Sequence, residues 1–170
     1  MSVYFCSNAF LPGHLAGAGR ADLISAALTA LNLGQIPASF LLLAVASKVE
    51  RRVWPFIASA VITLAALLGV VMTASEWTIL FAGLLGFILA IPFALGLALP
   101  AFLLPPEDIG RTAAAMFAIG YAWAMATSVL SGAAWDFAGD PRFAFLPIAL
   151  SLLPLFVAVP TIRLSHRAAI

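Results

Sequence analysis

Five long stretches of the sequence contain no Asp, Glu, Lys or Arg, and each is long enough to cross a lipid bilayer. A transmembrane helix needs about 17–25 residues, and one charge at its centre costs about 2.5–3.5 kcal/mol on insertion. The sequence therefore predicts an all-α fold: a polytopic membrane helix bundle with five transmembrane helices. The stretches cover about residues 23–47, 53–75, 77–104, 112–135 and 143–162.

Composition supports a membrane protein and excludes several other classes. Of the 170 residues, 64% are hydrophobic and 9% are charged, whereas soluble domains are about 45–50% apolar and 25% charged. The net charge of +1 offers no basic surface for nucleic acid. The single cysteine, Cys6, forms no internal disulfide and belongs to no metal-binding pattern. No nucleophile and base are paired in any span, so we expect neither an enzyme with catalytic residues, nor a metal, nor a cofactor.

The first residues do not fit a complete membrane helix. Residues 1–12, "MSVYFCSNAFLP", are apolar but about half as long as a transmembrane helix. We interpret them as the end of a helix whose beginning is missing; a peripheral or re-entrant segment is the alternative. With this partial helix, residues 1–170 are expected to form a single transmembrane domain.

The distribution of basic residues predicts an orientation. Six of the eight lie at one set of span ends and two at the other. The positive-inside rule places the richer set in the cytoplasm. We therefore expect an integral protein of a bacterial inner (plasma) membrane, with the N-terminal segment outside and the C-terminus cytoplasmic. The richer set is Lys48, Arg51, Arg52, Arg111, Arg163 and Arg167; the other is Arg20 and Arg142.

The first span carries a polar stripe beside a proline. Asn32, Gln35 and Ser39 are separated by three and four residues, which places them on one face of a helix. Lipid cannot satisfy two amides, so this face must meet protein or water. Interhelical hydrogen bonds and a substrate-facing wall are both open interpretations. Pro37 has no N–H and is expected to bend the helix near Gly34.

Two further spans carry candidate functional features. Pro92 makes the third span a second helix that can bend. In the fourth span, Tyr121 and Trp123 lie well inside the membrane, where they suit either a helix core or an apolar pocket with few polar groups. Four small residues of this span, spaced four apart, predict a seam for close helix packing. They are Gly120, Ala124, Ser128 and Gly132.

The remaining spans are almost bare of polar side chains, and no span interior holds a carboxylate. The second and fifth spans are therefore predicted to face lipid. Any coupling to protons would have to use groups at the span edges or another polypeptide. Among the edge groups, Asp136 is the best placed.

The loop between the first two spans, "LAVASKVERRVWPF", resembles the cytoplasmic loop of the major facilitator superfamily. Its closing basic pair aligns with Arg51 and Arg52, and Lys48 takes the preceding arginine position. Leu43 and Glu50 replace the two glycines of that pattern, and Ser47 replaces its aspartate. The chain as a whole is similar to the end of helix seven and helices eight to twelve of this superfamily, in the cyanate and nitroimidazole type branch. In this family, helices seven, eight, ten and eleven surround the central cavity. The first, third and fourth spans of this chain, which are polar or bendable, correspond to helices eight, ten and eleven.

The resemblance implies an incomplete C-terminal six-helix half of a twelve-helix secondary transporter. Such a protein moves a small, anionic or polar solute by alternating access. Its partners would be the lipid bilayer, the solute, and a missing N-terminal half or a second copy, without which it is expected to be inactive. The alternative is a small non-transporting membrane protein that binds a partner through the seam. On the transporter reading, the substrate-binding residues are Asn32, Gln35, Ser39, Tyr121 and Trp123, the gate residues Lys48, Arg51, Arg52 and Asp136, and the hinges Pro37 and Pro92.

Overall fold

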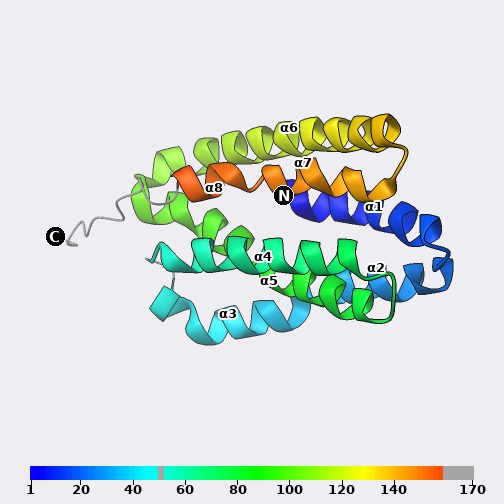
Figure 1. Cartoon of the computed structure of the whole chain (residues 1–170). Coiled ribbons are helices and arrows are strands. Elements are labelled where there is room, and N and C mark those ends of the chain that lie inside the picture. Colours follow the sequence, from blue (N-terminus) through cyan, green and yellow to red (C-terminus); the bar gives the residue numbers. More distant parts are fainter. Residues whose placement is uncertain (50–51, 159–170) are drawn as a thin grey trace.

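A computed structural model of the chain describes residues 1–49 and 52–158, and every regular element in that part is a helix (Figure 1). Two short 3₁₀ helices, η1 and η2, precede α2 and α7. The elements are α1 (Ser2–Gly17), η1 (Ala21–Leu23), α2 (Ile24–Leu33), α3 (Gln35–Val49), α4 (Trp54–Met72), α5 (Trp77–Leu103), α6 (Pro106–Ala138), η2 (Pro141–Ala144), α7 (Phe145–Leu150) and α8 (Leu153–Ala158).

Four of these segments are long and apolar enough to cross a membrane. They are Ala21–Val45, which joins η1, α2 and most of α3, and the helices α4, α5 and α6. This arrangement is compatible with an integral membrane protein. The described part of the fifth predicted span is instead a shorter run, Pro141–Phe156. It is interrupted between α7 and α8, where Pro154 has no N–H to donate to the carbonyl of Leu150.

Two helices extend beyond the ranges expected from the sequence. The first reaches Gly17 rather than residue 12. The fourth span was expected at about residues 112–135, but α6 starts at Pro106 and continues to Ala138. Proline suits the first helical position, and Glu107 and Asp108 in the first turn interact favourably with the helix dipole. Helix α6 therefore continues beyond its apolar part into charged residues at both ends.

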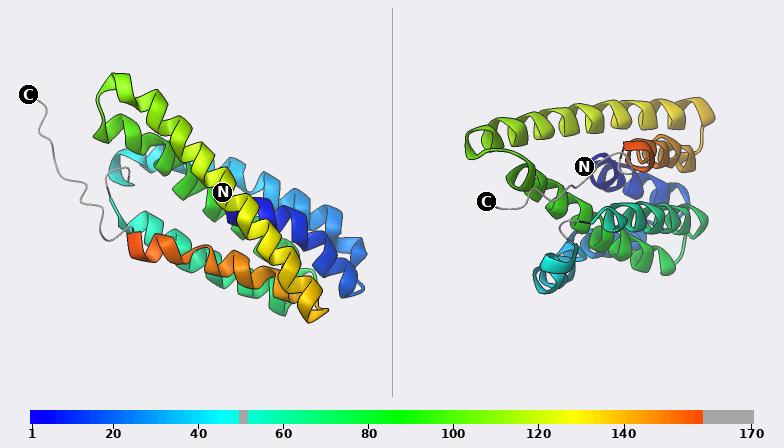
Figure 2. Two further views of the ribbon diagram at one scale, coloured as in Figure 1. Left: turned by 90° about the horizontal axis from the view of Figure 1, so that it is seen from above. Right: turned by 90° about the vertical axis from the view of Figure 1, so that its left-hand side faces the viewer.

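The helices pack around α5, which crosses the bundle obliquely (Figure 1). Helices α2, α3 and α4 pack against it, while α1 and α7 pack against α6. In Figure 1 and in the right-hand view of Figure 2, α3 and α6 lie at opposite edges of the bundle. The hydrophobic core forms where α1, α2, α4, α5 and α7 meet, and its most buried large members are Leu11, Leu15, Leu31, Val70, Leu85 and Ile148.

The backbones of α2 and α5 touch at glycines. A Cβ atom on Gly86 would lie 1.8 Å from the carbonyl oxygen of Leu31, and one on Gly34 would lie 2.4 Å from that of Gly83. No side chain separates the two helices at these points. Small residues allow such close approach in membranes, where van der Waals packing drives helix association.

The predicted sorting of helices into lipid-facing and interior ones is wrong for α4. In α4, 44% of the most apolar stretch is buried, against 33% in α5, 11% in the first span and 11% in α6. One face of the second span is therefore packed in the bundle, while its other face, with Leu68 62% exposed, remains open to lipid. Hydropathy does not separate a face packed on helices from one packed on lipid, because lipid tails are as apolar as Leu. Small and apolar residues of α4 are buried, including Ser59, Ala60, Thr63, Ala66 and Leu67.

We expect Gly86→Ala to destabilise the protein by about 1–3 kcal/mol, because the added methyl group meets backbone that cannot move aside. Gly96→Ala on the same helix is the matched control, since nothing lies within 4 Å of its added Cβ. Reversible unfolding by SDS in bicelles measures both free energies. Equal stabilities of the two variants would contradict the close contact between α2 and α5.

Candidate functional site

The first span is broken at its polar stripe. Helix α2 ends at Leu33, and α3 begins at Gln35 after a turn at Gly34. Pro37 lies in the first turn of α3, where its missing N–H has no consequence for that helix. The Ser39 hydroxyl donates to the carbonyl of Gln35 at 2.9 Å. Ser39 is thus satisfied within its own helix, and the structure brings it to neither of the cavities described below.

Asn32 joins α2 to α1 through a polar cluster. The Tyr4 hydroxyl donates to Asn32 Oδ1 at 2.5 Å, and Asn32 Nδ2 donates to Asn8 Oδ1 at 3.1 Å. Asn32 Nδ2 also donates to the Leu28 carbonyl at 2.7 Å, and Asn8 Nδ2 to the Tyr4 carbonyl at 2.9 Å. Neither Tyr4 nor Asn8 was predicted from the sequence to belong to a polar cluster. Their spacing of four along an apolar helix is the signal that identifies them as one polar face.

Gln35 and Tyr121 meet at one small cavity, although they belong to α3 and α6. The cavity has a volume of about 120 Å³. Within the described part of the chain, the Gln35 side chain is half-buried and makes no hydrogen bond of its own. Its amide is therefore free to bind a molecule in the cavity. The lining residues are Met1, Tyr4, Phe5, Gln35, Leu89, Ala90, Phe93 and Tyr121.

Aromatic rings from three helices surround this cavity. Phe5 and Tyr121 have ring centroids 5.7 Å apart, and Phe117 stacks on Tyr121 at 6.3 Å with an interplanar angle of 23°. Phe93 meets Phe117 edge-on at 6.4 Å. Such pairs add about 0.5–1.5 kcal/mol beyond their buried area. The rings connect α1, α5 and α6 beside the cavity that Gln35 lines.

Trp123 and Pro92 line a second, adjoining cavity. Its volume is about 360 Å³, and it lies between α1, α4, α5, α6 and α8. Met1, Leu89 and Phe93 border both cavities. Helix α5 continues as one helix past Pro92. Trp123 therefore lines the larger cavity, whereas Gln35 lines the smaller one.

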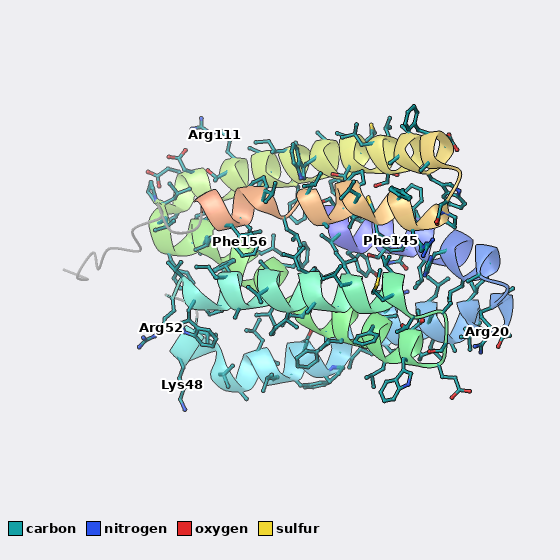
Figure 3. The ribbon with its side chains drawn as sticks, viewed as in Figure 1. Arg20, Lys48, Arg52, Arg111, Phe145 and Phe156 are labelled. Atoms are coloured by element: carbon teal, nitrogen blue, oxygen red, sulfur yellow. The ribbon has the colours of Figure 1, made fainter. Side chains whose placement is uncertain are left out.

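The candidate gate residues lie at two opposite ends of the bundle. Lys48, Arg52 and Arg111 are at one end and Arg20 is at the other (Figure 3). Lys48 and Arg52 are exposed; Arg51 lies outside the described residues. Asp136 is exposed near the C-terminal end of α6, at the end opposite to Lys48. The structure therefore does not bring Asp136 together with the basic gate residues.

The seam of small residues on α6 packs against α1 along only part of its length. Gly120 lies against Met1, whose sulfur would be 2.8 Å from an added Cβ, and Ala124 is buried beside Cys6. Further along α6 the buried positions are Thr127 and Ser131, while nothing lies within 4 Å of Gly132. At 3.6 residues per turn, a step of four residues rotates by about 40° beyond a full turn. The seam therefore packs against the N-terminal part of the chain at Gly120 and Ala124 but no longer at Gly132.

We expect Tyr4→Phe and Asn32→Leu to show coupled losses of stability. Each substitution removes a member of the same hydrogen-bonded cluster, and such bonds contribute about 0.6–2 kcal/mol in membranes. A double-mutant cycle of unfolding free energies in bicelles measures the coupling. Ser39→Ala is the control and should change stability by less than about 0.5 kcal/mol. Strictly additive effects of the two cluster variants would show that the hydroxyl and amide do not interact.

The two cavities suit a small solute that is held by neutral groups. No Asp, Glu, Lys, Arg or His side chain is found among their described lining residues. The polar side-chain groups available at the smaller cavity are the Gln35 amide and the Tyr4 and Tyr121 hydroxyls, set among aromatic rings. At the larger cavity they include the hydroxyls of Ser2, Ser59, Thr63 and Ser151. An apolar pocket with a few placed polar groups is typical of a small-molecule site. The chain matches no protein-family model, no curated protein and no solved structure.

Proposed function

We propose that this chain is the C-terminal part of a secondary active transporter of the major facilitator superfamily. It would move a small, anionic or polar solute across the inner membrane by alternating access. The observation that carries the proposal is the Gln35 amide, which lines a cavity and has no hydrogen bond partner within the described part of the chain. Amides left free in a membrane are costly unless protein, water or a ligand satisfies them. A transported solute would supply that partner.

The exposure of the two polar helices supports a partner across the cavity. The first span and α6 are the least buried of the four long segments. Their large apolar side chains remain uncovered, with Phe40 on α3 69% exposed and Ile119 on α6 71% exposed. We propose that an N-terminal half, or a second copy of this chain, closes the cavity against these helices. Lipid would cover the remaining apolar surface.

The charges at the two ends support a cytoplasmic location for the end that carries Lys48. This orientation follows the positive-inside rule, with Lys48, Arg52 and Arg111 toward the cytoplasm. In this orientation the basic residues lie at the inner mouth, where they would act as gate residues, and Pro37 and Pro92 would act as hinges. Asp136 would lie at the outer mouth.

The second candidate is a non-transporting protein that binds a membrane partner through α6. It is favoured by Gly132, which has open space around it and is free for a second helix to approach. Transport experiments separate the two candidates, because only a transporter moves solute when its cavity is complete.

We expect uptake of labelled small anions, such as cyanate and nitrate, by vesicles that contain this chain together with a candidate N-terminal half. Gln35→Leu should raise the KM about three- to tenfold, because it removes one neutral hydrogen bond to the solute. Ser39→Ala is the control, because its hydroxyl bonds only within α3. Equal uptake by wild type and Gln35→Leu would show that Gln35 does not bind the solute. No uptake with any partner would favour the non-transporting alternative.

A further inference from the structure

His14 is a buried titratable side chain outside the two cavities. It is 3% exposed, near the C-terminal end of α1. Its Nε2 lies 3.1 Å from the carbonyl oxygen of Val70 on α4. The ring of Phe145, labelled in Figure 3, reaches it from α7 in an edge-on contact with centroids 5.5 Å apart. Three helices therefore enclose this imidazole.

The hydrogen bond of His14 fixes its tautomer. A carbonyl oxygen only accepts, so Nε2 carries the proton of the neutral ring. Nδ1 is then a buried lone pair, and it has no hydrogen bond partner among the described residues. A buried polar atom without a partner costs about 1–3 kcal/mol. The atom that would take up a proton is thus the one that the packed structure leaves unsatisfied.

Two close contacts hold the His14 end of α1 against its neighbours. A Cβ on Gly13 would lie 2.3 Å from the ring of Trp135, and one on Gly17 would lie 2.9 Å from Pro141. The turn of α1 that carries His14 is therefore packed against the end of α6 and against the start of η2. Nδ1 is buried within this packing, so water reaches it only if the packing loosens.

Two charged groups belong to the turn that packs against this part of α1. Asp140 and Arg142 flank Pro141 in the sequence, and Pro141 lies against Gly17 of α1. They form an ion pair with Arg142 Nη2 2.7 Å from Asp140 Oδ2, and Arg142 holds the pKa of the Asp140 carboxyl below its usual value. Helices α2, α4, α5 and α7 carry no Asp, Glu, Lys, Arg or His. Of the remaining carboxylates at this end, Asp22 pairs with Arg20, and Glu76 and Asp136 are exposed.

We propose that His14 is the proton-binding site of this chain, and that its protonation draws Asp140 away from Arg142 and opens the outer turn. The proton comes from water on the outer side and adds to Nδ1, and no other bond forms or breaks. The resulting N–H is a donor that needs an acceptor, and Asp140 is the carboxylate next to Pro141, which packs against α1 three residues after His14. This inference rests on the proposed transport function and identifies its coupling ion as the proton.

The chain permits a direct test because it contains two histidines. In His166→Asn, a ring carbon or nitrogen NMR signal of labelled histidine reports on His14 alone. We expect the full chain in lipid nanodiscs to show one titration between about pH 8.5 and pH 4.5. On protonation, amide hydrogen exchange over residues 139–145 should rise about tenfold or more. Asp140→Asn should weaken the proton affinity of His14 about three- to tenfold, since it removes the attracting charge.

Matched variants separate protonation from loss of packing. His14→Gln retains a side-chain donor for the Val70 carbonyl, and in this variant exchange over 139–145 should no longer rise in acid. Absence of titration, titration without increased exchange, or an unchanged affinity in Asp140→Asn would each overturn the proposal. The NMR experiment needs neither solute nor partner. Titration without any uptake would therefore contradict transport and leave the proton site intact.

Discussion

The backbone contact between α2 and α5 is the constraint on which the rest of the structure depends. At Gly86 and Gly34 the two helices approach so closely that one methyl group has no space. This contact holds the end of α2 against α5 and fixes where α3 begins. Because α3 starts at that point, Gln35 faces the cavity bordered by α1 and α6. A looser crossing would move the amide away from Tyr121.

The polar groups of the first span are satisfied in different ways. Asn32 is fully engaged with α1 and with its own helix, and Ser39 with its own helix. Gln35 differs from both, because its side chain lines a cavity and has no partner within the described part of the chain. Of the two interpretations left open by the sequence, Asn32 fits interhelical bonding and Gln35 fits a solute-facing wall. One stripe thus combines a structural and a candidate binding residue.

The sequence predicted the helical class because charge-free runs of this length leave few other folds. It also located the departure from regular helix near Gly34, where a glycine and a proline are three residues apart. It did not identify Tyr4 and Asn8, because their role depends on α1 lying beside α2. It misjudged α4, because packing against helices and against lipid select the same apolar residues. The break before α8 depends on a single proline, Pro154, in an otherwise apolar run.

The proposed transport requires that the Gln35 cavity is open to water in the assembled protein. Cys6 is the only cysteine, so Cys6→Ala gives a background for single cysteines at chosen positions. A charged, membrane-impermeant thiol reagent applied to vesicles that contain this chain and its proposed N-terminal half measures access to each position. The account predicts labelling at positions 35 and 121, reduced by a bound solute, and none at Leu68, a largely exposed apolar residue of α4. Labelling at 68 together with protection at 35 and 121 would contradict it.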